Sequence, residues 1–343
     1  MPAAGVALAR QTTMMAALAS LFFLPMRLDE CDDGGDPGSD CPVCRADFAI
    51  YDPNYEDDGV WEEEVTALIT LMDDFGWSYE IVDTQDINNG ILGVGDDRRY
   101  RALIGPGGYA WPRNRDIQEE GEAGILAFID SGGNYVGFCA GTYHAADEVV
   151  WAEEATGGGG TWNRPEDYQS YAYDLGLFEG SATGPFGWTP WDDGTGASLQ
   201  PVRIDTSIET MATIGIGEET RFFYYGGPFF TVSPDSSLSP EVWARAVRPD
   251  DAPEDADIGA DEATIIHYMY GDGHVILFSY HPEILINSDV DGITLSDAID
   301  ETTMTWDTGD QTWDEINLQS WNIVHAALQI AANEEVEALT ELP

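Results

Sequence analysis

Short runs of strand-forming residues alternate with segments of helical periodicity between residues 48 and 138. The strand-like runs are Phe48–Tyr51, Tyr79–Val82, Arg101–Ile104 and Tyr135–Phe138, each followed by a turn. Strands and helices that alternate through short loops predict a doubly wound, mostly parallel α/β sheet flanked by helices. Ligands of such a sheet bind beyond the carboxyl ends of its strands.

Apolar residues recur at helical spacing in three segments. The first helix is expected to carry Trp61, Val65, Leu68, Ile69 and Met72 on one face. A second helix is expected over residues 117–129 and a terminal helix over residues 318–332. These helices supply the layers that cover the sheet.

The later part of the chain adds two features to this core. Runs at 264–270 and 274–280, joined by Gly271-Asp272-Gly273, predict a β-hairpin. Residues 151–200, rich in Gly, Trp, Asp and Thr, are interpreted as a long surface excursion that rims the site. Residues 46–335 are therefore expected to form one domain.

The chain is strongly acidic, with 64 Asp and Glu against 13 Arg, no Lys and a formal net charge of −51. Binding a polyphosphate requires basic side chains that displace its counterions. A field this negative repels nucleic acids and anionic lipids. Nucleic-acid partners are therefore excluded, and the expected partner is a small-molecule substrate.

The acidic residues are spread over the whole chain. In molar salt the Debye length is about 3 Å, so self-repulsion is screened. The spread predicts a halophilic surface. The alternative is an ordinary acidic protein at low salt, where charge this dense opposes compaction.

Residues 1–28 have the layout of a secretory signal peptide: Arg10, a mostly apolar run from Met14 to Met26, then Arg27. The run is too short to span a bilayer comfortably but fits the apolar region of a signal. We expect an extracytoplasmic protein, secreted or surface-anchored, without another membrane-spanning segment. The alternative is an over-extended gene start, with a methionine of this run as initiator, which predicts a cytoplasmic protein.

An acidic, glycine-rich linker at residues 29–45 contains Cys31, Cys41 and Cys44. The last two have CxxC spacing, which suits a disulfide, a redox pair or half of a zinc site. No second CxxC or nearby histidine completes a tetrahedral zinc set, so no metal is expected. In an exported protein, one disulfide among the three is the expected state. Cys31 also stands where a lipidated cysteine would.

Cys139 follows the strand-like run 135–138 and precedes a helix, with the small residues Ala140 and Gly141 directly after it. At a sharp strand-to-helix turn, a thiolate is stabilised by the helix N-terminus, and backbone N–H groups point at a developing oxyanion. The pair Gly107-Gly108 ends another strand, where glycine lets an N–H approach the same oxyanion. The alternative for Cys139 is a buried, inert thiol.

The segment His281-Pro282-Glu283 supplies a base and a carboxylate. A histidine can take the thiol proton and return it to the leaving group. A carboxylate two residues later can reach back to the far ring nitrogen and fix the tautomer. Together with the cysteine turn, the segment predicts a triad of Cys139, His281 and Glu283.

Three motifs occur in one chain order: Pro106-Gly107-Gly108, Gly137-Phe138-Cys139-Ala140-Gly141 and His281-Pro282-Glu283. Together they resemble the class I glutamine amidotransferases, which hydrolyse a glutamine amide through a thioester. The resemblance implies Cys139 as nucleophile, His281 as general base and Glu283 as its orienting partner. It also implies the N–H groups of Gly108 and Ala140 as oxyanion donors.

Residues 222–230 narrow this resemblance. They include Tyr224-Tyr225-Gly226-Gly227-Pro228, which is similar to the Tyr-x-Gly-Gly-Pro segment of the biotin-protein ligase N-terminal domain family. The resemblance extends over residues 48–332. The Gly-Gly-Pro between these aromatic residues indicates a shaped loop near the site, so Gly226 and Gly227 are expected to contact the substrate.

Two departures from these families shape the expected function. Glutaminase domains usually carry glutamine two residues after the glycine of the nucleophile elbow, which is the sharp turn that presents the cysteine; that glycine is Gly141 here. This chain has Tyr143 at that position, so a substrate other than glutamine is expected to contact Tyr143. The glycine-rich biotinyl-adenylate loop of the biotin-ligase catalytic domain does not occur in this sequence. We expect a thiol hydrolase or amidase-like enzyme that acts on an amide or acyl bond of a small molecule without a cofactor. The alternative is a non-catalytic ligand-binding or structural module, and the oligomeric state stays open.

Overall fold

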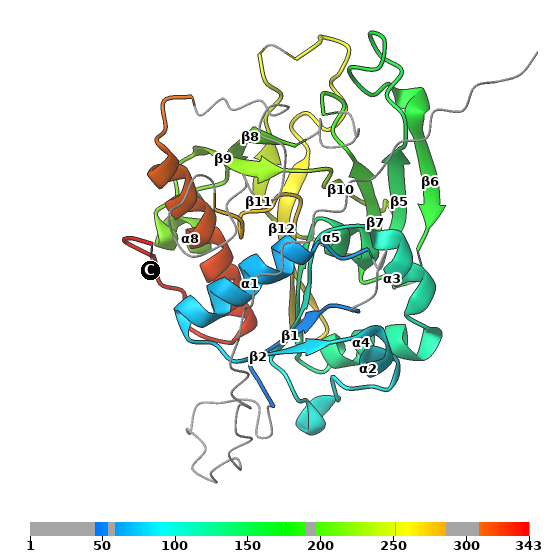
Figure 1. Cartoon of the computed structure of the whole chain (residues 1–343), viewed down its shortest axis with the longest axis vertical. Helices are drawn as coiled ribbons and strands as arrows, with labels where there is room; N and C mark the ends of the chain where they lie inside the picture. Colours follow the sequence, from blue (N-terminus) through cyan, green and yellow to red (C-terminus); the bar gives the residue numbers. More distant parts are fainter. Residues whose placement is uncertain are drawn as a thin grey trace, which may run out of the picture. The chain divides into compact units, whose positions relative to one another are not determined.

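Five parallel strands form the half of the sheet that the sequence predicted (Figure 1). The structure, a computed structural model, describes residues 45–53, 59–173, 175–189, 197–250, 252–285 and 309–342. The strands lie in the order β2 (Tyr79–Val82), β1 (Phe48–Tyr51), β3 (Ala102–Gly105), β4 (Asn134–Phe138) and β13 (Gly273–Phe278). Every neighbouring pair among them is parallel, which is the flavodoxin-like order. The predicted fold class is confirmed.

Alternate residues of these strands face two different helix layers. In β1, Phe48 and Ile50 join one apolar cluster, whereas Ala49 and Tyr51 join another on the opposite face. The first cluster includes residues of α1 (Glu62–Phe75) and α8 (Trp313–Ala331). The second includes residues of α2 (Thr84–Asn88), α3 (Ala110–Asp116), α4 (Glu119–Asp130) and α5 (Ala140–Ala145). Both faces are therefore covered, as a parallel sheet requires.

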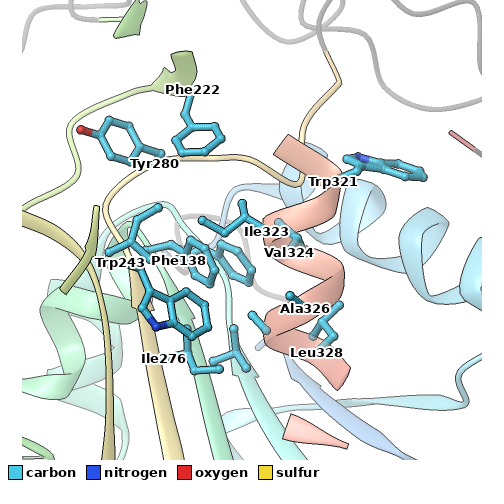
Figure 2. Close-up of a cluster of buried hydrophobic side chains, with 14 of the residues drawn as sticks. Phe138, Phe222, Trp243, Ile276, Tyr280, Trp321, Ile323, Val324, Ala326 and Leu328 are labelled. Atoms are coloured by element: carbon cyan, nitrogen blue, oxygen red, sulfur yellow. The ribbon is translucent and has the colours of Figure 1, made fainter. Parts of the chain in front are cut away.

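The cluster beneath α8 holds the central strands in place (Figure 2). Phe138 of β4 and Ile276 of β13 lie in one cluster with Ile323, Val324 and Leu328 of α8, and each of the five is 0% exposed. Burying a side chain of this size stabilises the fold by about 1.5–3 kcal/mol. This packing fixes the two strands from whose carboxyl ends the predicted nucleophile and base emerge.

One predicted helix begins earlier in the structure than expected, and several observed helices, α3 among them, were not predicted. α8 begins after Thr312, which forms a capping box with Glu315, so its first turn lies before Leu318, where the apolar periodicity starts. α3, with the sequence AWPRNRD, was not predicted, because its polar residues and proline obscure the helical period.

An antiparallel extension continues the sheet beyond β13. The hairpin of β12 (Ala263–Tyr270) and β13 is confirmed. The next strands are β10 (Phe229–Val232), β7 (Phe178–Gly184), β5 (Ala146–Ala152) and β6 (Tyr168–Ala172). A branch from β12 contains β11 (Glu241–Ala246), β8 (Ser198–Ile204) and β9 (Glu219–Tyr224), and α6 (Glu209–Ile214) lies between β8 and β9 in the chain.

The segment interpreted as a surface excursion contributes strands to this extension. In β7, Phe178 and Ala182 are buried while Glu179 is exposed, so the strand alternates between a buried and an open face. The remaining inward positions are the glycines 180 and 184. Small inward residues hide the period-2 apolar pattern by which a strand is detected.

The predicted signal peptide at residues 1–28 lies outside the described residues, as do Cys31, Cys41 and Cys44 of the linker. Within the described ranges, no helix combines the length and apolar character needed to cross a bilayer.

Candidate active site

The predicted site residues follow the carboxyl ends of three adjacent strands. β3, β4 and β13 are neighbours in the sheet, with Gly105 opposite Gly137 and Phe138 opposite Phe278. The chain continues from these ends into the glycine pair 107–108, the cysteine at 139 and the histidine at 281. One cavity is lined by residues from all three segments. The topology therefore brings together residues far apart in sequence.

Cys139 lies at a strained turn between β4 and α5. Its φ of 41° and ψ of −100° are unusual for a residue other than glycine. Its N–H donates to the Phe278 carbonyl over 2.9 Å, and its Sγ lies 3.5 Å from the Tyr225 carbonyl oxygen. A strained strand-to-helix turn is the geometry that presents a nucleophile above an α/β sheet. The thiol is free and 5% exposed.

Gly141 makes this turn possible. A Cβ at position 141 would lie 2.0 Å from the Gly105 carbonyl oxygen, and the Gly141 N–H donates to the Pro106 carbonyl over 3.1 Å. Helix α5 thus rests on the end of β3 at a separation that a side chain would prevent.

Two backbone N–H groups beside Cys139 suit the predicted oxyanion role. Among the described hydrogen bonds, none has the N–H of Gly108 or of Ala140 as donor. Gly108 lines the cavities on both sides of the thiol, whereas Ala140 is 0% exposed and begins α5. The oxyanion assignment stays a prediction.

His281 and Glu283 are in contact, as the sequence predicted. His281 is 1% exposed, and its Nδ1 lies 3.0 Å from Glu283 Oε1. The backbone N–H of His281 donates to the Phe223 carbonyl over 2.8 Å. The Trp61 ring packs edge-on against the imidazole, with 5.2 Å between the two ring centroids. Backbone and ring contacts therefore fix the imidazole.

A second carboxylate reaches the same ring nitrogen, and the sequence reasoning missed it. Glu64 Oε2 of α1 lies 3.1 Å from His281 Nδ1, and Glu64 is 0% exposed. A Cβ at Gly107 would lie 2.0 Å from Glu64 Oε2 and 2.7 Å from His281 Cε1. Gly107 therefore allows the carboxylate and the ring to approach each other. Glu64 stands in the run Glu62-Glu63-Glu64, and nothing in the sequence of so acidic a chain distinguishes it.

The two carboxylates raise the affinity of the cluster for protons. Burial lowers the pKa of the His281 ring, but Glu64, Cys139 and Glu283 outweigh burial and raise that pKa well above its ordinary value. Burial and the adjacent Glu64 raise the pKa of Glu283, against the attraction of His281.

The same three side chains also have the spacing of a metal site. One donor atom each from Glu64, His281 and Glu283 lie within 4.8 Å of one another. Nδ1 of the histidine is already at hydrogen-bond distance from both carboxylates, so a cation would have to displace the proton there. The expectation of no metal stays a prediction.

The contact between thiol and imidazole is looser than that between imidazole and carboxylates. Among the described residues, Nε2 of His281 has no hydrogen-bond partner, yet Cys139 is close enough to raise the pKa of the ring. Catalytic hydrogen bonds are often long without substrate and tighten once it binds.

Tyr143 links the elbow helix to the Gly-Gly-Pro loop. Its hydroxyl donates to the Gly226 carbonyl over 2.8 Å, and its ring packs edge-on against Trp151. A Cβ at Gly227 would lie 1.8 Å from the Ser279 carbonyl oxygen, so the loop rests on the end of β13. Tyr143 and Gly226 line a cavity beside Cys139, whereas Gly227 acts in packing.

The mostly parallel α/β fold is that of the class I glutamine amidotransferase-like proteins. Residues 97–331 match the family described as biotin-protein ligase, N terminal. The chain belongs to this family. The matched region contains the predicted triad, and Glu64 lies outside it.

Three solved structures resemble the chain at low identity. A glutamine amidotransferase is 16% identical with a TM-score of 0.42, over 69% of this chain and 90% of that chain. A putative ThuA-like protein from Parabacteroides merdae is 13% identical with a TM-score of 0.45, over 85% and 91%. A glutamine amidotransferase from Thermotoga maritima is 11% identical with a TM-score of 0.34, over 69% and 75%. No curated protein matches the chain.

Proposed function

We propose that the protein is a thiol hydrolase that cleaves an amide or activated acyl bond of a small molecule through a thioester on Cys139. The observation that carries this proposal is the strained cysteine turn, which shares a cavity with a buried histidine held by carboxylates. A structural thiol needs neither the strained backbone nor the paired histidine.

The first half of the reaction forms the thioester. His281 Nε2 accepts the thiol proton, and the sulfur attacks the acyl carbon, whose oxygen becomes an oxyanion facing the N–H groups of Gly108 and Ala140. The tetrahedral intermediate then breaks its bond to the leaving group. The imidazolium returns the proton to that group, which departs as an amine or alcohol.

The second half releases the acid. Water replaces the leaving group, His281 takes one proton from it, and the hydroxyl attacks the thioester carbon. The carbon–sulfur bond breaks, and Cys139 regains its proton from the imidazolium. One substrate and one water give one acid and one amine or alcohol.

We assign Glu64 and Glu283 as positioning residues in this scheme. Both face Nδ1 of His281, so they accept the Nδ1 proton in hydrogen bonds, stabilise the imidazolium and leave Nε2 to exchange a proton with Cys139. Neither needs to touch the substrate.

Acyl-enzyme formation tests the proposal. Protein in molar KCl is mixed with p-nitrophenyl acetate, and the acetylated peptide is located by mass spectrometry. We expect an acetyl group on Cys139 in the native protein, a burst of p-nitrophenol, and neither in Cys139→Ser or His281→Asn. Iodoacetamide provides an internal comparison. If Cys139 reacts no faster than reduced Cys41 and Cys44 in the folded protein, the activated thiol is ruled out.

The non-catalytic alternative predicts a different outcome in the same experiment. A module that binds a ligand without turnover would leave Cys139 unacetylated while its folded structure is intact, as circular dichroism would show. It would also bind its ligand equally well in the native protein and in Cys139→Ser.

We further propose export as the location of this activity, on the pattern of residues 1–28. Mass spectrometry of the native protein tests this directly. If protein recovered from the cytosol has an intact N-terminus that begins before Met14, export is contradicted.

A further inference from the structure

Two cavities meet at Cys139. One, of about 230 Å³, extends from the thiol to β5 and β6, and the other, of about 220 Å³, extends to Trp61 and His281. They share four residues: Gly108, Tyr109, Cys139 and Tyr225. The thiol therefore stands between two spaces that are lined differently.

The proton path assigns a role to each cavity. His281 lines only the smaller cavity. In the proposed hydrolysis, this histidine must deliver a proton to the leaving group, so that group lies in the cavity that His281 lines. The acyl portion then extends from the carbon bonded to Cys139 into the larger cavity.

The larger cavity has a distinctive composition. Its wall is mostly aromatic: Tyr109, Trp111, Tyr143, Trp151, Tyr171, Tyr173 and Tyr225. Tyr109 and Trp111 are each 59% exposed, so part of this aromatic wall is open to solvent. Among the described lining residues, the one carboxylate is that of Glu153, whose Oε1 accepts a hydrogen bond from the Tyr171 hydroxyl over 2.8 Å.

We propose that this aromatic cavity binds an acyl group that carries an ammonium or quaternary-ammonium cation. The faces of Trp and Tyr rings attract cations, and a nearby carboxylate adds to that attraction. Among the described residues that line the cavity there is no Lys, Arg or His, so a carboxylate on the acyl portion would enter without a counter-ion from them. This proposal rests on the proposed hydrolase function, since the thioester defines which portion is acyl.

A set of p-nitrophenyl esters that differ only at the far end of the acyl chain tests the proposal. The three ends are trimethylammonium, its neutral isostere tert-butyl, and carboxylate. In molar KCl, where the field of the whole protein is screened, we expect the cationic ester to acylate Cys139 about tenfold faster than the neutral one. The anionic ester should be slowest.

Variants separate the cavity from general charge effects. Trp151→Leu should reduce the preference of the cationic over the neutral ester towards unity, whereas Asp314→Asn on α8 should not change it. Moving the cation to the leaving group, as in a choline ester, should remove the preference as well. Equal rates for cationic and neutral esters, or a preference that survives Trp151→Leu, would overturn the proposal.

The outcome stays interpretable if no ester is hydrolysed. The affinities of the three corresponding amides for the Cys139→Ser variant can be measured by tryptophan fluorescence, and this measurement does not require turnover. Tighter binding of the cationic amide in Cys139→Ser than in Cys139→Ser with Trp151→Leu supports the cavity even if the hydrolase proposal fails. Equal affinities of the cationic and neutral amides contradict it.

Discussion

The two halves of the sheet contribute differently to the site. The parallel half, β2-β1-β3-β4-β13, ends in Cys139 and His281, and the helix after β1 carries Glu64. The antiparallel extension contributes Trp151, Tyr171 and other aromatic walls around the thiol. We infer that the parallel half positions reacting atoms and that the extension selects what reaches them.

This division has a physical basis. Neighbouring parallel strands end at one edge, so short loops place several side chains on a common point with little freedom. The strands of the antiparallel extension provide broad surfaces beside this edge. Their residues can be substituted without disturbing the turn at Cys139. Variants in the parallel half should therefore change reaction rates or folding, whereas variants in the extension should change ligand preference.

The largest expected effect is the loss of acyl transfer in Cys139→Ala. Removing a nucleophile from a catalytic triad lowers turnover by about 10⁴-fold or more. The comparison is Tyr143→Phe, which removes only the hydroxyl that donates to Gly226. We expect that variant to retain acylation of Cys139 within about tenfold, as measured by the p-nitrophenol burst. Comparable losses in both variants would show that chemistry and selection are not separable.

Gly141→Ala tests how closely α5 must approach β3. The added Cβ would lie 2.0 Å from the Gly105 carbonyl, so the helix must shift, and we expect a loss of about 3 kcal/mol in the free energy of unfolding. Gly124→Ala in α4 is the matched control, because its Cβ would meet nothing within 4 Å. Alanine there should stabilise the helix by about 0.5–1 kcal/mol. The urea concentration at the midpoint of unfolding measures both changes. Equal midpoints in Gly141→Ala and in the native protein would contradict the close packing of α5 on β3.

The fold was predictable from the sequence where the local apolar patterns are strong. The site was predictable where its residues stand in recognisable motifs. The strands around Ile50 and Val136 are continuous apolar runs, and Cys139 and His281 stand in recognisable segments. Glu64 was not predictable, because its role arises from the approach of α1 to Gly107, which no local pattern encodes. The aromatic wall was missed for a related reason, since β6 has the exposed, polar sequence YQSYA.

Glu64 and Glu283 should act redundantly on His281. Because either carboxylate can hold the Nδ1 proton, Glu64→Gln and Glu283→Gln should each slow acylation of Cys139 by about tenfold, or 1.4 kcal/mol. The double variant should lose more than the product of the single losses. Glu62→Gln, an exposed position on the same helix, is the control.

The pH dependence of acylation gives a readout that a purely structural role would not move. Loss of either carboxylate removes one cause of the raised pKa of His281, so the profile should shift to lower pH in each single variant. A Glu64→Gln variant with native rate and native pH profile would remove Glu64 from the scheme. A loss of activity with chelator in the native protein would instead indicate that the cluster holds a metal.

The smallest expected effect is a dependence of stability on pH. The pKa values of His281 and Glu283 are raised in the folded protein, so the native state retains protons that the unfolded chain has released. Their stabilising contribution is complete below their unfolded pKa values and is lost as pH rises through the folded ones. Burial lowers the pKa of His144 to about 3, which has the opposite effect, but only below about pH 6.5.

Between pH 7 and 9, roughly the window above the His144 transition, the raised pKa values of His281 and Glu283 should therefore make the free energy of unfolding fall with pH. The slope is at most about 1.4 kcal/mol per pH unit for each retained proton. Glu283→Gln removes one titrating group, so its slope should be shallower, whereas Glu62→Gln should match the native protein. Urea unfolding at constant molar salt measures the three slopes. Identical slopes in all three proteins would mean that the buried cluster does not retain the proton, and that the parallel half holds its histidine by packing alone.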